Sequence, residues 1–144
     1  MASNERKMMD NALKTILIPF LREHGFKGSF PHFRRKNATN IDLITFQFNK
    51  WGGSFIVELS SCSLEGVTMH WGEHIPPNKV TAHHVNERFR LGEKSRVADG
   101  NWFYFKKAKL EIDYEKVAIN VLKLLNISDR SWISSLLKNR FFIN

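Results

Sequence analysis

Apolar positions near the start of the chain repeat with the period of an α-helix. Between Ser3 and His24 they recur every three to four residues, so they share one stripe of a helix. Gly25 suits the left-handed backbone that often follows a helix end. Pro19 interrupts the pattern, and a kink or a break is expected near Ile18 because proline removes a backbone donor. The predicted stripe consists of Met9, Leu13, Ile16, Leu17, Phe20 and Leu21.

The next part of the chain has the two-residue alternation and the turn residues of an antiparallel sheet. Phe30–Lys36 is predicted as an edge strand, because Pro31 cannot donate a ladder hydrogen bond. A turn at residues 37–40 leads into Ile41–Asn49, which is apolar on both faces and therefore reads as a central strand. Gly52-Gly53 supplies the next reversal, and a strand with alternating apolar residues follows it.

The later strands are less regular. Val67–Trp71 is predicted as a fourth strand, and residues 85–91 fit either an irregular strand or a short helix. Trp102–Lys106 contains four consecutive aromatic residues, which cannot all be left in water without cost. We therefore expect this run to form a largely buried strand that closes the sheet.

The C-terminal part returns to the helical period. Asp113 can cap one helix, and a second helix is predicted to start at Ser128. The predicted buried face of the first of these helices consists of Tyr114, Val117, Ala118, Val121, Leu122 and Leu125. The fold class is therefore α+β: an antiparallel sheet of about four to five strands with one N-terminal and two C-terminal helices packed on it. No linker or repeat is seen, so residues 1–144 are expected to form one domain.

Charge is distributed unevenly along the 144 residues. The net charge is +8, of which residues 1–40 contribute +5, residues 41–100 contribute −1 and residues 101–144 contribute +4. Such a balance favours acidic proteins or polyanions as partners, although a small protein can also be basic only for solubility.

The lone Cys62 excludes an internal disulfide and any multi-cysteine metal site. No signal-peptide or membrane-spanning pattern is found, so a cytoplasmic protein without membrane contact is expected.

Motifs that would nominate an enzyme are weak. His70–His74 matches the H-x-x-E-H pattern of zinc peptidases, but its neighbours favour strand, where residues four apart lie too far from each other to share one ion. His83 and His84 form a second polar cluster with Glu87. Because scattered histidines are more often surface or strand residues, His70, His74, His83 and His84 are only weak candidates for metal ligands. No metal site or cofactor is predicted. Glu58 is the one acid whose burial needs checking, and an outward-facing strand position is expected for it rather than a catalytic one. An enzyme using the region between His70 and Glu87 remains the third hypothesis, and no catalytic residue is nominated.

Two segments run from aromatic to basic residues, namely Phe33–Lys36 and Tyr104–Lys107. Single-stranded nucleic acid is commonly held by stacked aromatics and a cationic groove. The alternative is that the aromatics face the core and the cations mark strand ends. A nucleic-acid surface at the sheet rim would use Arg34, Arg35, Lys36, Lys106, Lys107 and Lys109.

Several short segments follow one another along the chain in a characteristic order: Ile18–Lys27, Phe33-Arg34, Phe46-Gln47, Lys50-Trp51, Arg88–Gly92, Asp99 and Trp102-Phe103. Their order resembles a family of small bacterial proteins classed as domain of unknown function 4304. The resemblance covers about Met8 to Leu125, and the chain departs from it at Phe103, where the family usually shows a second tryptophan. It implies no activity, cofactor or catalytic residue. Small families of this kind include many protein-binding partners, such as antidotes to secreted toxins.

These observations favour a non-enzymatic protein-interaction module, of which an immunity protein is one kind, with an acidic protein as its partner. The alternative is a nucleic-acid-binding domain. The residues best placed to make contacts are Arg34, Arg35, Lys36, Trp51, Arg88, Arg90, Trp102, Lys106 and Lys107.

Overall fold

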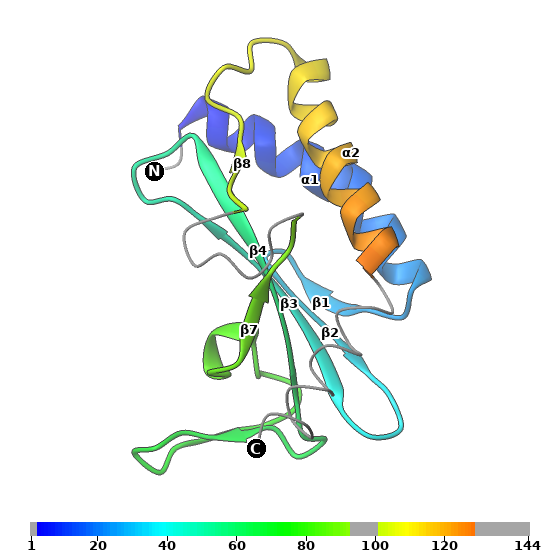
Figure 1. Ribbon diagram of the computed structural model, residues 1–144, viewed down its shortest axis with the longest axis vertical. Helices are drawn as coiled ribbons and strands as arrows, with labels where there is room; N and C mark the ends of the chain where they lie inside the picture. The colour runs from blue at the N-terminus through cyan, green and yellow to red at the C-terminus, as the bar shows by residue number, and fades with distance from the viewer. Residues whose placement is uncertain (1–2, 93–100, 129–144) are drawn as a thin grey trace.

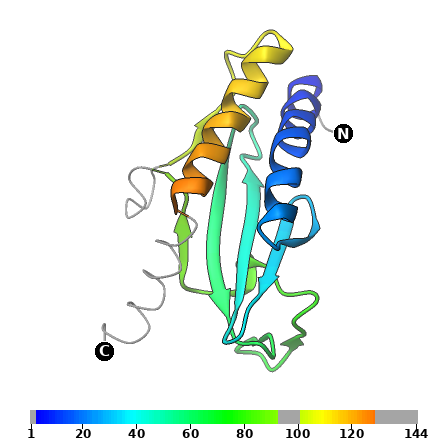
Figure 2. The same cartoon turned by 90° about the vertical axis from the view of Figure 1, so that its right-hand side faces the viewer.

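The computed structural model describes residues 3–92 and 101–128. Two helices, α1 (Asn4–Glu23) and α2 (Glu111–Ser128), lie side by side on one face of an antiparallel sheet, as Figures 1 and 2 show. The α+β class and the helices on one sheet face are therefore confirmed. The second C-terminal helix, predicted from Ser128 onward, lies almost wholly outside the described residues. Neither α1 nor α2, the helices of the described part, could cross a membrane.

The main sheet has six strands among the described residues, one or two more than predicted. Ile41–Phe48 lies in its centre as predicted, and antiparallel pairing runs through every neighbouring pair. The order is β1 (Lys27–Ser29), β2 (His32–Lys36), β3 (Ile41–Phe48), β4 (Ser54–Cys62) and β7 (Arg88–Arg90), with β8 (Phe103–Tyr104) also paired to β4.

The edge position predicted for Phe30–Lys36 is wrong, because β1 pairs with the outer side of β2. Pro31 lies in the turn between β1 and β2, ahead of the first residue of β2, so its missing N–H removes no bond from the ladder. The pattern did not reveal β1, because three residues are too few to display an alternation.

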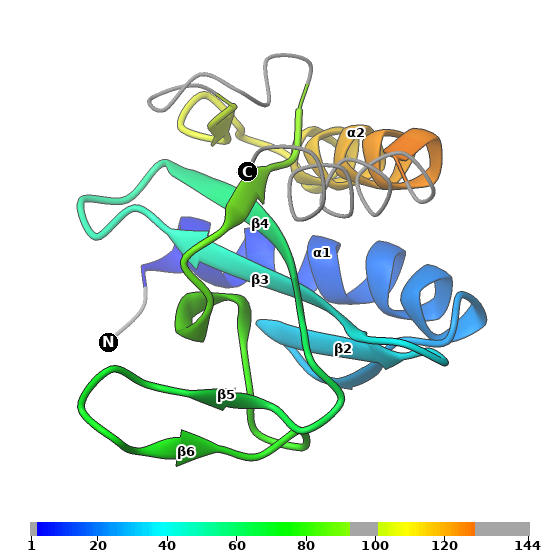
Figure 3. The same ribbon diagram turned by 60° about the horizontal axis from the view of Figure 1, so that its bottom comes forward.

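The predicted fourth strand is present only as two residues in a separate small sheet. There, β5 (Val67–Thr68) pairs with β6 (His74–Ile75) in a hairpin that stands apart from the main sheet (Figure 3). A short 3₁₀ helix, η1 (Ala82–His84), follows it and donates Ala82 N–H to Thr45 Oγ1 of β3. Residues 85–91, which fitted either an irregular strand or a short helix, contain strand β7, and η1 ends just before them at His84.

Two glycines of this hairpin provide a matched test of the turn geometry. Gly66 and Gly72 have φ of +95° and +99°, but a Cβ on Gly66 would collide with the carbonyl oxygen of Ile75, whereas nothing lies within 4 Å of a Cβ on Gly72. Left-handed backbone costs an alanine about 1–2 kcal/mol at either position. We expect Gly66→Ala to lower the free energy of unfolding by at least about 1 kcal/mol more than Gly72→Ala does, because the clash adds a packing cost. Urea unfolding of both variants measures the difference, and equal losses would contradict the contact.

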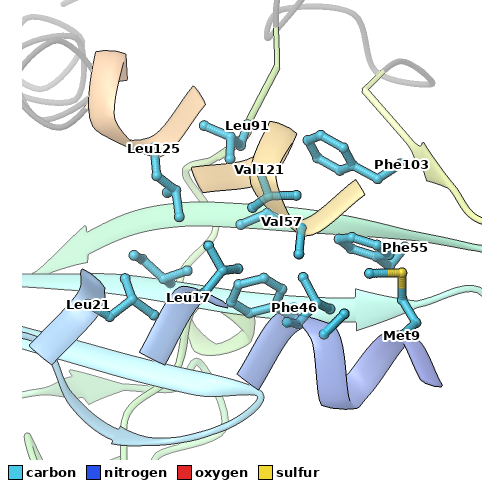
Figure 4. Close-up of a cluster of buried hydrophobic side chains, with 14 of the residues drawn as sticks. Met9, Leu17, Leu21, Phe46, Phe55, Val57, Leu91, Phe103, Val121 and Leu125 are labelled. Atoms are coloured by element: carbon cyan, nitrogen blue, oxygen red, sulfur yellow. The ribbon is translucent and has the colours of Figure 1, made fainter. Parts of the chain in front are cut away.

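The core lies between the helices and the sheet. Leu17 and Leu21 of α1 and Val121 and Leu125 of α2 face Phe55 and its neighbours on β3 and β4 (Figure 4). Every residue of the two predicted helical faces is either buried or packed against this cluster. A smaller second cluster on the other side of the sheet includes Ile41, Leu43, Cys62, Val80 and Ala82.

Helix α1 continues through Pro19 to Glu23, so the chain does not leave the helix near Ile18. Thr15, whose carbonyl loses its usual donor four residues later, is exposed, as is Pro19 itself. Water can therefore hydrate the freed carbonyl, and the cost of the proline stays small enough for the helix to persist.

The aromatic run is buried only at alternate positions. Phe103 and Phe105 are 8% and 3% exposed, whereas Tyr104 between them is 69% exposed. The prediction of a largely buried run is therefore wrong, because β8 has one face on the core and the other in solvent. Helix α2 starts at Glu111, and the Asp113 carboxylate accepts hydrogen bonds from the backbone N–H groups of Lys109 and Leu110.

Candidate binding surface

Two segments far apart in sequence meet at one end of the sheet. The turn between β3 and β4 lies against the segment that follows β8: Phe105 N–H donates to the carbonyl of Gly53 at 2.9 Å, and Ser54 pairs with Tyr104. The two segments are in close contact at Gly53, because a Cβ there would lie only 3.3 Å from Cβ of Lys106. We call this end of the molecule the basic tip; it consists of Lys50, Trp51, Tyr104, Lys106, Lys107 and Lys116.

The aromatic side chains of the basic tip stand in solvent on a well-defined backbone. Trp51 is 85% exposed, and Lys50 Nζ lies 5.1 Å from the centroid of its ring. The turn is fixed by two hydrogen bonds to Asn49, one from Trp51 N–H to the side-chain oxygen and one from Gly52 N–H to the carbonyl. Large aromatic side chains exposed on such a turn are available for a partner to cover.

A groove of about 600 Å³ opens between β8 and the start of α2. Phe105, Ala108 and Val117 contribute its apolar part. Asp113 is the one acid of the lining, and its hydrogen bonds from Leu110 and Lys109 N–H lower the pKa of this carboxyl. The other lining residues belong to the basic tip: Tyr104, Lys106, Lys107 and Lys116. The groove thus combines an apolar part with three lysines.

The first basic segment lies at the other end of the sheet, beside the turn between β2 and β3 (Figure 1). Arg34 Nε donates to the carbonyl of Val80 at 2.7 Å, and burial lowers the pKa of its guanidinium. Arg35 faces the helices, where it bonds Asp42 and the carbonyl of His24, while Lys36 is exposed. The basic residues grouped by sequence reasoning are therefore not one surface.

Arg88 and Arg90 flank a buried carboxylate on the sheet face away from the helices. Glu58 is 6% exposed and lies opposite Arg90 in the β4–β7 register. Its Oε2 lies 3.5 Å from Nε of Arg88, and its Oε1 lies 3.3 Å from Nε2 of His83 without a hydrogen-bond partner. Arg90 also stacks on Trp102, with Cζ 5.5 Å from the ring centroid. This cluster ties η1 and β7 to β4. Sequence reasoning flagged Glu58 but expected it to face outward, because burial by a distant segment leaves no local signal.

His32 extends this polar region across the sheet. Its Nδ1 lies 3.0 Å from Thr45 Oγ1, and its ring meets that of His83 edge-on, with centroids 5.8 Å apart. Burial lowers the pKa of His32, and His83, Arg34 and His84 lower it further.

This shift predicts a loss of stability in mild acid. Because the folded pKa lies below 6.5, the unfolded chain binds the proton first as the pH falls. The contribution of His32 is therefore complete above that pH and is lost as the pH drops toward the folded pKa. We expect His32→Asn to show a smaller decrease in unfolding free energy between about pH 7.5 and about pH 5 than the wild type. Urea titrations of both proteins measure this decrease, with His70→Asn as an exposed control; identical slopes for His32→Asn and wild type would contradict the assignment.

His70 and His74 lie in and beside the turn of the β5–β6 hairpin rather than on a helix. His74 contacts Thr68 Oγ1 through Nδ1 and the carbonyl of Glu65 through Nε2. Trp71 between them is 60% exposed. Within residues 3–92 and 101–128, no group of three or more histidine, cysteine or acidic side chains could hold a metal ion.

Comparison with known proteins yields one finding. Residues 17–135 match the model of a protein family described as Domain of unknown function (DUF4304). No curated protein and no solved structure matches the chain.

Proposed function

The chain belongs to the DUF4304 family, and from this premise we propose that it is a non-enzymatic protein-interaction module whose basic tip binds an acidic partner protein. The observation that carries the proposal is the exposure of Trp51 and Tyr104 beside lysines, on backbone held by a turn hydrogen bond and by strand pairing. Tryptophan and tyrosine are enriched at the energetic centres of protein interfaces, and the lysines attract an acidic surface. An antidote that neutralises a toxin is one kind of protein that works in this way. The proposal includes a cytoplasmic location, with which the free thiol of Cys62 is consistent.

Binding of single-stranded nucleic acid is the second candidate, because Trp51 and Tyr104 could stack on bases beside the lysines. Two observations favour the protein partner. Arg34 and Arg35 already donate to groups within the fold, so the cationic track is shorter than the sequence suggested. A phosphate backbone in the groove would also meet the Asp113 carboxylate, whereas a protein can place an N–H group there.

Affinity capture at low salt tests the proposal with two variants of equal charge. One reverses Lys50, Lys106 and Lys107 to glutamate; the other reverses Lys27, Lys36 and Lys79, which are exposed at other places. We expect the wild type and the second variant to retain the same acidic protein, and the first variant to lose it. Raising the salt concentration should weaken the capture, because exposed charges are screened. Recovery of no protein, or equal recovery by both variants, would contradict the proposal.

A further inference from the structure

We propose that the groove between β8 and α2 receives one aromatic side chain of the partner, and that this side chain is flanked by carboxylates in an acidic segment. This inference rests on the proposed function and names what the basic tip recognises. Charge alone would let the basic tip bind any polyanion without selectivity, whereas an anchor in a groove selects one sequence among acidic proteins.

The size and lining of the groove fit an aromatic anchor. Its volume of about 600 Å³ lies within the range of about 300–1,000 Å³ found for sites that hold small ligands. Phe105, Ala108 and Val117 offer apolar contact, and the exposed ring of Tyr104 forms one wall. Aromatic rings stack on or edge against one another, so Tyr104 gains more from a second ring than from an aliphatic side chain.

The charged residues around the groove define what lies beside the anchor. Lys106, Lys107 and Lys116 line it together, so carboxylates next to the anchor in sequence would each find an ammonium group. Asp113 adds a single acceptor, and backbone hydrogen bonds already hold its charge in place. A tryptophan suits this arrangement best, because its indole N–H is a donor for a carboxylate while its ring is apolar.

Fluorescence polarisation of two labelled peptides, titrated with the protein, tests the inference. The peptides are Glu-Asp-Trp-Asp-Glu and Glu-Asp-Ala-Asp-Glu, which have the same charge and differ only in the anchor. We expect the tryptophan peptide to bind the wild type at least about tenfold more tightly. Tyr104→Ala should reduce its affinity to that of the alanine peptide, which should bind both proteins alike. Trp71→Ala removes an exposed aromatic of the β5–β6 hairpin and should change nothing.

The outcomes separate this inference from the proposed function. Equal binding of the two peptides, lost when Lys50, Lys106 and Lys107 are reversed, would overturn the anchor and leave the acidic partner standing. Binding of neither peptide, or binding unaffected by the reversal, would overturn both. Tighter binding of labelled decathymidine than of either peptide would assign the groove to nucleic acid and overturn the inference. Dependence of self-association on Trp71, measured by sedimentation, would make a second copy the occupant and would also overturn it.

Discussion

Replacing Arg35 with alanine is expected to lower the free energy of unfolding by about 3–5 kcal/mol at neutral pH. The carboxylate of Asp42 is fully buried, and Arg35 Nε donates to it at 2.9 Å. Asn37 and Asn40 add weaker bonds of 3.3 Å, and Arg35 also donates to the carbonyl of His24. Removing the guanidinium therefore leaves a buried charge and a helix-end carbonyl without their strongest partner.

The pH dependence of this loss identifies its cause. Burial raises the pKa of Asp42, and the hydrogen bond and charge of Arg35 act against that rise. Without Arg35 the pKa rises further, so Asp42 takes up a proton at higher pH and the buried charge disappears. We expect the loss in Arg35→Ala to shrink as the pH is lowered, and Asp42→Asn to remove most of it at neutral pH. Urea unfolding of the two single variants and the double variant gives the coupling, and a loss that is the same at every pH would contradict this account.

Replacing Phe55 with alanine is expected to cost about 3–5 kcal/mol. Its side chain is 0% exposed and lies at the centre of an aromatic cluster, stacked on Phe103 at 5.3 Å and tilted against Phe48 at 5.2 Å. It also contacts Phe46 and Phe105. The expected loss has two parts: the free energy gained by burying the ring, which the variant lacks, and the cost of the cavity that the neighbouring rings do not fill.

The matched control for Phe55 is Tyr104→Ala. Tyr104 lies on β8, the strand that pairs with the start of β4, but it is exposed, and its removal should change the unfolding free energy by less than about 0.5 kcal/mol. Urea unfolding of both variants measures the two losses. A loss for Phe55→Ala no larger than that for Tyr104→Ala would contradict the central place of Phe55 in the core.

The helices and the longer strands could be predicted because their patterns are long enough to repeat. The stripe of α1 spans several turns. β1 and β6 could not be predicted, and only two residues of the predicted strand Val67–Trp71 form β5, because two or three residues show no period and their positions depend on distant neighbours. Pro19 misled the interpretation, because its cost depends on whether water reaches the freed carbonyl of Thr15.

The basic tip was only partly predictable. Trp51, Lys106 and Lys107 were among the predicted contact residues, but the sequence does not show that the turn after β3 and the segment after β8 lie together. Arg35 and Arg34 look the same in sequence as Lys106 and Lys107, since each basic pair follows an aromatic residue. Only the partners contributed by other elements, Asp42 and the carbonyl of Val80, distinguish the arginines within the fold from the lysines in solvent.

The central claim is that the basic tip recognises an acidic protein segment. The most direct test is polarisation of the tryptophan-containing acidic peptide and of labelled single-stranded oligonucleotides, scanned from low to physiological salt. The account predicts that the wild type binds the peptide more tightly than the oligonucleotides. It also predicts that reversing Lys50, Lys106 and Lys107 abolishes peptide binding, while reversing Lys27, Lys36 and Lys79 leaves it in place. Tighter oligonucleotide binding near physiological salt, or peptide binding that both variants retain, would contradict the claim.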